Sequence, residues 1–543
     1  MKRLLLCFLL LLPLAASAVT QQNGMVVAAQ RLAAEAGIAM LEKGGNAFDA
    51  AAATALALGV VEPGSSGIGG GGFFLLYIAK ENRYVFIDAR ETSPVLAGNG
   101  KVYENLSSID GPAAAGVPGL AAGIDHLVLK YGRLKLRNIV SPAVKLAREG
   151  FVVSPRLVNM IRFRRTAFNQ TARELFDKKE GEIIRQPGLG DTLERFGNKG
   201  RKGFYRGQTA GRLVANMKHD GGLIRESDMA SYRIKEREPV TFHWQGHTFI
   251  SAPLPSSGGM TLAHIFRQIQ NDELKGMVQT DRIHLLIEAM KRAYRDRNRY
   301  LGDSDYVDIP EDYLDSARLN ELRNSIDMGR ATPSEDLQGI GEASGGVDTS
   351  HFSVIDSEGN MVAATLSINY PFGSGYVSPS TGILLNDEMD DFATIPGEAN
   401  AYGLVQGQAN GVQPGKRMLS SMTPTFVIGP DRTFIVGTPG GSRIISMVLL
   451  ASLGFVLNES ASSNWVNAPR FHHQFLPDEV QYEKGAFVKE TSTELIKRGH
   501  HLKQLNRNYG NMHAIVVDRK TGKLTGIADS RGEGIAIRAE QEK

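Results

Sequence analysis

The chain has 543 residues, a formal net charge of +3 and a single cysteine. This nearly neutral balance gives neither the basic footprint of a nucleic-acid-binding protein nor a polybasic patch for a membrane surface. With Cys7 alone, one chain can form neither a disulfide nor a thiolate metal site. A chain of this length can bury a large hydrophobic core, and it can hold two or more domains.

The first eighteen residues have the pattern of a secretory signal peptide. Met1-Lys2-Arg3 is basic, an apolar run extends from Leu4 to Leu14, and Ala16-Ser17-Ala18 fits a cleavage site. The run is shorter than the roughly 20 residues of a membrane-spanning helix, and the alternative is a buried N-terminal helix. We expect a periplasmic or secreted protein that is cut near Ala18. Its mature chain would then lack cysteine, and so also a cysteine nucleophile.

Helical and strand patterns follow in mixed order. Apolar residues spaced as on a helix span 32–40, and Gly44-Gly45 marks the end of that helix. We expect Asp49 to cap a second, alanine-rich helix over 50–58. A loop over 63–72 then precedes a buried strand over 73–79. Residues 133–322 have mainly the pattern of charged helices, including a long one over 281–301.

The glycine run over 67–72 fits the formula G-x-G-x-x-G. A dinucleotide-binding loop follows a strand and opens a helix, whereas here the helix comes first and the strand after. We therefore interpret the run as a place of close backbone packing rather than a nucleotide site. The sequence also contains no H-E-x-x-H, G-x-S-x-G, Walker or C-x-x-C motif.

The composition changes at the junction near residue 348. Residues 330–348 have few large apolar side chains, which predicts a mobile linker, and strands are expected over 349–356 and 361–369 directly after it. In the second strand, Val362, Ala364, Leu366 and Ile368 face one way, and Thr365, Ser367 and Asn369 the other. Strands over 425–428 and 433–437 and a helix from 444 follow. This mixed order indicates stacked sheet and helix layers.

A threonine that opens a strand after a linker suits an N-terminal nucleophile. Cutting the bond between Asp348 and Thr349 would free an α-amine with an ordinary pKa of about 7.7–8.0, which fits a general base near neutral pH. That amine would lie beside the hydroxyl that it activates. Before the cut, the same hydroxyl could attack the Asp348 carbonyl. From the residues alone, however, a threonine at this position is more often simply a β-forming residue.

The segment from Thr349 to Asp356, T-S-H-F-S-V-I-D, resembles the opening of the small subunit of γ-glutamyltransferases. Other segments are similar to that family in the same order, namely 44–50, 88–91, 255–259, 384–392, 419–425, 439–443 and 467–473. The resemblance implies an α/β (α+β) fold, a four-layer αββα N-terminal nucleophile hydrolase sandwich. A large subunit, 19–348, and a small subunit, 349–543, would build it jointly and remain associated as a heterodimer.

The resemblance also implies a role for each matching residue. Thr349 would be the nucleophile, Ser367 would support it, and Gly440 and Gly441 would form the oxyanion hole. The substrate-binding residues would be Arg90, Ser420 and Ser421 for the donor's α-carboxylate, Asn369, Glu388 and Asp391 for its α-ammonium, and Tyr402 as a lid. We assign no chemistry to His472-His473, which we expect to be a buried structural pair.

The residues alone leave other interpretations open. Arg90 would otherwise form a surface ion pair, the two serines would be turn residues, and Gly440-Gly441 would be a plain turn before a helix. The acidic residues of 386–391 would otherwise suggest a cation site. The resemblance assigns Glu388 and Asp391 to the substrate amine instead, so we expect no metal and no cofactor.

The implied reaction transfers a γ-glutamyl group from glutathione or another γ-glutamyl compound, through an ester on Thr349, to water, an amino acid or a peptide. Two alternatives remain, a cephalosporin (glutaryl) acylase-like amidohydrolase and a secreted solute-binding protein that never cleaves itself. The retained carboxylates argue against the acylase, because its glutaryl donor has no ammonium group to pair with them. Ser350 and Ser367 stand where the family usually has threonine, and Ser530 where it usually has proline.

Overall fold

The computed structural model describes residues 23–337, 349–394, 407–457 and 462–540. The expected signal peptide, Asp348 of the expected cleavage site and the expected lid residue Tyr402 lie outside the described residues. Within these ranges, no helix combines the length and the apolar character needed to cross a membrane.

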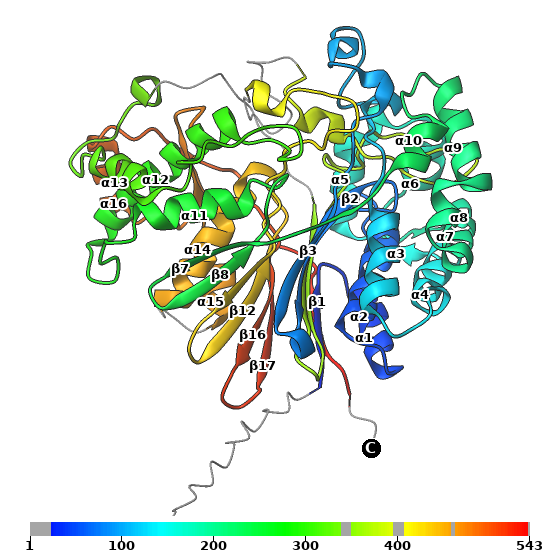
Figure 1. Ribbon diagram of the computed structural model, residues 1–543, viewed down its shortest axis with the longest axis horizontal. Helices are drawn as coiled ribbons and strands as arrows, with labels where there is room; N and C mark the ends of the chain where they lie inside the picture. The colour runs from blue at the N-terminus through cyan, green and yellow to red at the C-terminus, as the bar shows by residue number, and fades with distance from the viewer. Residues whose placement is uncertain (1–22, 338–348, 395–406, 458–461, 541–543) are drawn as a thin grey trace, which may run out of the picture.

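Two β-sheets face each other in the middle of the molecule, and helices cover the outer face of each (Figure 1). This is the four-layer αββα arrangement that the resemblance implied. The first sheet has the order β18-β1-β9-β10-β2-β3-β6, and the second has the order β17-β16-β12-β11-β8-β7. Every neighbouring pair in both sheets is antiparallel.

The strands of the first sheet are β1 (Met25–Ala28), β2 (Gly71–Ile78), β3 (Arg83–Ala89), β6 (Lys235–Arg237), β9 (Ser350–Ile355), β10 (Met361–Ser367) and β18 (Ile535–Arg538). Those of the second are β7 (Val240–Trp244), β8 (His247–Ser251), β11 (Thr425–Ile428), β12 (Arg432–Gly437), β16 (His513–Asp518) and β17 (Leu524–Ala528). Two smaller sheets contain β4 (Phe151–Val152) with β5 (Ile183–Ile184), and β13 (Phe471–His472), β14 (Val480–Tyr482) and β15 (Leu502–Gln504).

The first sheet is covered by α1 (Arg31–Glu42), α2 (Ala47–Val61), α3 (Leu120–Tyr131), α4 (Leu136–Glu149), α5 (Pro155–Arg164), α6 (Gln170–Phe176), α7 (Pro187–Lys199), α8 (Arg201–Tyr205), α9 (Gly207–His219) and α10 (Glu226–Ser231). On the outer side of the second sheet lie α11 (Gly258–Gln268), α12 (Gln279–Tyr300), α13 (Ser316–Asn324), α14 (Ile444–Leu457), α15 (Ser462–Asn467) and α16 (Lys489–Lys497).

Strand β10 shows how the sequence pattern fixes the layers. Val362, Ala364 and Leu366 pack into the core under α1 and α2, whereas Met361 and Ala363 pack into the core between the two sheets. This is the predicted alternation, and both faces are apolar because both are buried.

Both sheets combine segments from before and after residue 348. Strand β1 lies between β9 and β18, β2 pairs with β10, and β8 pairs with β11. Each of these contacts joins the two parts of the chain by backbone hydrogen bonds within a buried sheet. A cut at the junction would therefore leave two chains that share both sheets, with β1 of the first chain inserted between β9 and β18 of the second.

Two local predictions need correction. Asn46, not Asp49, caps α2: its side chain accepts from the N–H groups of Phe48 and Asp49, and Asp49 completes a capping box at the third helical position. The helix begins three residues earlier than expected. In addition, 133–322 is mainly helical as expected, but it also contains the strands β4 to β8, which were not predicted. Gln245 and Gly246, with φ of 47° and 72°, form the tight turn of the β7–β8 hairpin.

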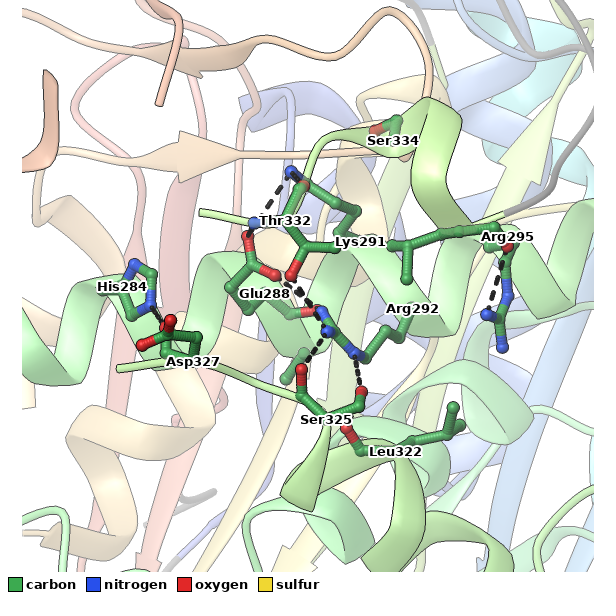
Figure 2. A network of polar contacts seen from close by, with 12 residues as sticks. His284, Glu288, Lys291, Arg292, Arg295, Leu322, Ser325, Asp327, Thr332 and Ser334 are labelled. Carbon is green, nitrogen blue, oxygen red and sulfur yellow. Dashed lines mark hydrogen bonds and ion pairs between the residues drawn. The ribbon is translucent and has the colours of Figure 1, made fainter. Parts of the chain in front are cut away.

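Helix α12 holds the segment that precedes the undescribed residues 338–348 (Figure 2). Arg292 donates from Nε and Nη2 to the side chain and carbonyl of Ser325, at 3.0 and 3.1 Å. Lys291 donates to the Thr332 carbonyl and lies 3.0 Å from the carboxylate of Asp478, in the later part of the chain. These contacts tie residues 325–332 to α12, and they tie α12 to the region after the junction.

Candidate active site

A pocket between the ends of the two sheets brings together most of the predicted site residues. Those that line it are Arg90, Thr349, Ser367, Asn369, Asp391, Ser420, Ser421 and Gly441. Glu388 lies directly behind Arg90, and Gly440 directly precedes Gly441. The residues come from β3, from the starts and ends of β9 and β10, and from the loops beside β11 and β12. Residues more than 300 positions apart therefore meet at one place.

Thr349 lies at the open end of β9, where it is 4% exposed. Ser350 is paired with Leu366 in the β9–β10 ladder, so extending this register by one residue places Thr349 opposite Ser367. The Ser367 hydroxyl accepts from the backbone N–H of Asn369 at 2.8 Å. That contact restrains the side chain, while the strand register places Ser367 beside the expected nucleophile.

The neighbours of Thr349 are also fixed. The Ser350 hydroxyl donates to Glu62 at 2.7 Å. The serine thus makes a hydrogen bond through its hydroxyl, although it lacks the methyl group of the threonine that is usual at this position. His351 lies 2.8 Å from the hydroxyl of Thr365. Complete burial lowers the pKa of His351 well below its ordinary value, which keeps the ring neutral. The start of β9 is thus held on both faces.

The position of Asn369 differs from the prediction. The sequence pattern placed it on the same strand face as Ser367, but β10 ends at Ser367, and Asn369 has a left-handed φ of 70°. Its side-chain amide donates to the Asp387 carbonyl at 3.2 Å. The chain turns here to meet 386–391, so Asn369 reaches the pocket through a turn rather than through strand alternation.

Gly440 and Gly441 form a sharp turn between β12 and η9 (Gly441–Arg443), which leads into α14. Their φ angles are 146° and 56°, and a Cβ on Gly440 would lie 2.4 Å from Cε of Met447. Only glycine adopts such a backbone easily. As the first residue of η9, Gly441 has an N–H that the helix itself does not use. A glycine turn at the start of a helix can direct N–H groups toward a developing oxyanion, and the oxyanion-hole role of Gly440 and Gly441 stays a prediction.

Arg90 meets both predicted ammonium-binding carboxylates. Its Nη1 lies 2.7 Å from Glu388, its Nη2 contacts Asp391, and Nε donates to the Met418 carbonyl at 3.4 Å. Glu388 and Asp391 are the two ends of η7 (Glu388–Asp391), where side chains three residues apart lie on one face. The resemblance assigned Arg90 and the two carboxylates to opposite ends of a substrate. In the structure Arg90 is also the counter-ion of both carboxylates, and buried charges require such a partner.

A third carboxylate was not predicted. Glu91 is fully buried, 3.7 Å from Arg90. Burial raises its pKa to about 8, with Arg90 opposing the shift, and burial likewise raises the pKa of Glu388 well above its usual range. The carboxylates also raise the pKa of Arg90 against the effect of its own burial. Its place in the segment 88–91 was the only sequence signal for Glu91.

The two predicted serines present hydroxyl groups to the pocket. The Ser420 hydroxyl accepts from the N–H of Met422 at 3.1 Å, and the Ser421 hydroxyl accepts from Arg297 at 3.1 Å. Neither hydroxyl donates to any residue that the structure describes, so each can donate its proton to an anion in the pocket. Arg297, on α12, also lines the pocket and was missed by the sequence analysis.

The remaining predictions concern packing. His472 and His473 are buried, and they contact Ser446 at 2.8 Å and Asp478 at 3.1 Å outside the pocket. A Cβ on Gly69 would lie 2.0 Å from the Leu384 carbonyl, and one on Gly70 2.2 Å from that of Ser367. The glycine run therefore allows the close backbone approach that was predicted, directly beneath the pocket.

The chemistry available here is that of acyl transfer to and from a small zwitterion. One wall offers the threonine hydroxyl, and the glycine turn offers N–H groups for an oxyanion. Guanidinium and serine hydroxyl groups suit a carboxylate, while Glu388 and Asp391 suit an ammonium group. Both charge signs occur within a single small pocket.

A profile of the gamma-glutamyltranspeptidase family matches residues 33–539. The glutathione hydrolase proenzyme of Pseudomonas aeruginosa is 39% identical over 548 residues, covering 96% of each protein. A cephalosporin acylase from Bacillus halodurans has a similar structure, with a TM-score of 0.84 and 27% identity over 96% of this chain and 97% of that one. A Helicobacter pylori gamma-glutamyltranspeptidase chain, 38% identical with a TM-score of 0.55, matches over 57% of this chain and 93% of its own. Because the family profile spans nearly the whole chain and the P. aeruginosa relative is 39% identical, the chain belongs to the gamma-glutamyltranspeptidase family.

Proposed function

We propose that this chain is an autoprocessed γ-glutamyltransferase and glutathione hydrolase. The observation that carries the proposal is the pocket in which Thr349 lies beside a guanidinium group, two serine hydroxyls and two carboxylates. These groups complement the α-carboxylate and the α-ammonium of a γ-glutamyl donor. The P. aeruginosa relative is named a glutathione hydrolase proenzyme, which agrees with both the substrate and the processing.

Processing would begin with the Thr349 hydroxyl. Its oxygen attacks the Asp348 carbonyl, the peptide C–N bond breaks, and the amide nitrogen receives the proton. Water then hydrolyses the resulting ester, which leaves a carboxylate on Asp348 and a free α-amine on Thr349. The products would be a large subunit, 19–348, and a small subunit, 349–543. The two sheets that both parts of the chain share support their association as a heterodimer.

In the mature enzyme, the new α-amine would accept the proton from the Thr349 hydroxyl. The oxygen attacks the γ-carbonyl of the donor, and the N–H groups of Gly440 and Gly441 stabilise the oxyanion. The leaving amine takes up the proton, and a γ-glutamyl ester remains on Thr349. Attack by water releases glutamate, whereas attack by an amino acid or peptide amine forms a new γ-glutamyl amide.

A cephalosporin acylase-like activity is the second candidate, and the similarity to the B. halodurans structure favours it. A glutaryl group has the shape of a γ-glutamyl group without the α-ammonium. Glu388 and Asp391 then decide between the two, because a donor without a cation would bring no ammonium group to pair with these carboxylates. The geometry therefore supports the γ-glutamyl donor better.

Two matched chromogenic amides test the proposal, γ-glutamyl-p-nitroanilide and glutaryl-p-nitroanilide. We expect purified protein to show two unequal bands on a denaturing gel and to release nitroaniline mainly from the γ-glutamyl compound. Thr349→Ala should give one band and no release from either compound. A preference for the glutaryl amide would favour the acylase, and an inactive single chain would favour a binding protein.

We also propose export to the periplasm or the medium, on the basis of the basic and apolar pattern of residues 1–18. Mass spectrometry of the large subunit after expression with its own N-terminus tests this proposal. A chain that begins near Val19 in the exported fraction is the expected result. An intact Met1 on active protein inside the cell would contradict it.

A further inference from the structure

Arg297 is a buried arginine in the wall of the pocket that contains Thr349. It lies near the end of α12 and is 1% exposed. Its guanidinium makes no ion pair with a carboxylate of any described residue. Burial lowers its pKa, and nearby groups, Tyr294 and Asp391 among them, oppose this shift. A buried charge without a counter-ion is costly, and such groups concentrate at functional sites.

The contacts of Arg297 instead go to hydroxyl and amide oxygens. Nε donates to Ser257 at 2.9 Å, Nη2 donates to Ser421 at 3.1 Å, and Nη1 donates to Asn298 at 2.9 Å. A hydroxyl oxygen that accepts from a guanidinium must direct its own proton elsewhere. Ser257 donates its proton to the Ser420 carbonyl at 2.7 Å. The proton of Ser421 has no such acceptor among the described residues and is available to the pocket.

The segment 255–257 holds the serine pair from the other side. The N–H of Ser420 donates to the Pro255 carbonyl at 2.8 Å, and the N–H of Ser257 donates to the Ser420 carbonyl at 2.8 Å. The Ser256 hydroxyl donates to the Met422 carbonyl at 2.6 Å. Residues 420–422 are therefore held by the turn before α11, and Arg297 links that turn to Ser421.

Arg297 also adds a second cation to the pocket. The terminal nitrogens of Arg90 already contact Glu388 and Asp391, the two carboxylates proposed to bind the donor's ammonium group. A donor with one carboxylate and one ammonium adds one charge of each sign. With Arg297 included, two cations stand near Glu388, Asp391 and the buried Glu91, so each end of the donor can meet a group of opposite charge.

We propose that Arg297 is a positioning residue for the donor's α-carboxylate. It holds Ser421 so that the hydroxyl proton points into the pocket. It also contributes positive charge for the donor's carboxylate, because the charge of Arg90 is partly neutralised by Glu388 and Asp391. The inference rests on the proposed function, since it assumes a donor with an α-carboxylate. The segment 255–259, to which the proposed mechanism gives no role, then acts as the support for this subsite.

The test uses two competitive inhibitors, L-glutamate and 4-aminobutyrate, which differ only by the α-carboxylate. In Arg297→Gln, we expect the inhibition constant for L-glutamate to rise about tenfold or more, which corresponds to about 1.4 kcal/mol. The constant for 4-aminobutyrate should change less than about twofold. The KM for γ-glutamyl-p-nitroanilide should rise with that for L-glutamate, whereas kcat changes little, because lost ground-state binding raises KM alone.

Two further variants separate positioning from folding. Arg297→Lys keeps the charge and loses the fork, so its effect on L-glutamate should be intermediate. Arg299→Gln changes an exposed arginine on the same helix and should match the wild type for both inhibitors. Equal weakening of both inhibitors in the Arg297 variants would overturn the inference, and so would failure of both variants to be cleaved. If the wild type itself fails to hydrolyse γ-glutamyl-p-nitroanilide, the proposed function is wrong instead.

Discussion

The guanidinium of Arg90 lies 2.7 Å from the carboxylate of Glu388, and both side chains are almost fully buried. Arg90 follows β3 in the part of the chain before the junction, whereas Glu388 opens η7 after it. The central ion pair of the pocket therefore joins the two subunits that processing would create. The pocket therefore takes the cation Arg90 from the part of the chain before the junction and the carboxylates Glu388 and Asp391 from the part after it.

Glu388→Gln should weaken recognition of the donor's ammonium group without preventing cleavage. Glutamine is neutral, and Asp391 still pairs with Arg90, so no uncompensated charge is buried. A hydrogen bond from a charged group is worth about 1 kcal/mol more than a neutral one, so the KM for γ-glutamyl-p-nitroanilide should rise roughly fivefold to tenfold. Inhibition by glutarate, which lacks the ammonium group, is the control and should not weaken. Equal loss for both compounds would contradict this role.

Gly440→Ala should lower kcat by about 100-fold or more, as expected when an oxyanion-hole donor is displaced. Alanine is strained at a φ of 146°, and its Cβ would collide with Met447. Steady-state kinetics on cleaved protein measure the effect. Adding Met447→Ala relieves the collision but not the strain, so the double variant should remain slow. Full recovery in the double variant would mean that packing alone explains the loss.

Lys291→Met should destabilise the protein and weaken the association of the two subunits. Lys291 is 2% exposed and lies 3.4 Å from Glu288 and 3.0 Å from Asp478. Its removal takes one cation from the buried Glu288, which keeps Arg292, and one from the partly exposed Asp478, at a cost of about 1–3 kcal/mol. The measurements are thermal unfolding and the subunit ratio after gel filtration in mild urea. Lys145→Met, in an exposed pair with Glu149, is the matched control and should change neither. Unchanged unfolding in Lys291→Met would contradict the role of the network.

Buried histidines should make the fold sensitive to acid. Burial lowers the pKa of His472, His500 and His513 to about 3, against about 6.5 in an unfolded chain. Below pH 6.5 the unfolded state binds protons that the folded state does not, so the free energy of unfolding should fall as the pH falls toward 3. Each histidine contributes at most about 1.4 kcal/mol per pH unit. Urea unfolding of Thr349→Ala at several pH values measures this slope.

His472→Asn should reduce that slope by up to one proton, because one titrating group is removed. His219→Asn is the control, since the His219 side chain is 87% exposed. It should leave the slope unchanged. A free energy of unfolding that stays constant between pH 7 and pH 5 would show that these histidines are not held neutral by the fold.

The features that the sequence predicted well are those with a local pattern. Alternation in β10 defines two buried faces, and the spacing of Glu388 and Asp391 puts both on one side of a helical turn. The start of β9 at Ser350 follows the change in composition after 348. In each case, neighbours in the sequence are neighbours in space, so periodicity is sufficient.

The features that escaped prediction depend on distant segments. The run over 295–299 alternates charged and polar residues, as an exposed helix does, yet contacts with 257 and 421 bury Arg297. Asn369 reaches the pocket only because 386–391 packs against the end of β10. The β7–β8 hairpin is short and lies among charged helices, so its alternation was overlooked. When distant segments bury a polar residue, the sequence on either side of that residue gives little sign of it.

The account depends on a break in the backbone that makes Thr349 the first residue of its chain. The most direct measurement is the N-terminal sequence of the smaller fragment from active, purified protein, together with its intact mass. We predict a fragment that begins Thr-Ser-His-Phe and extends to Lys543. A fully active protein with an unbroken chain across 348–349, or a fragment that begins at another residue, would contradict the account.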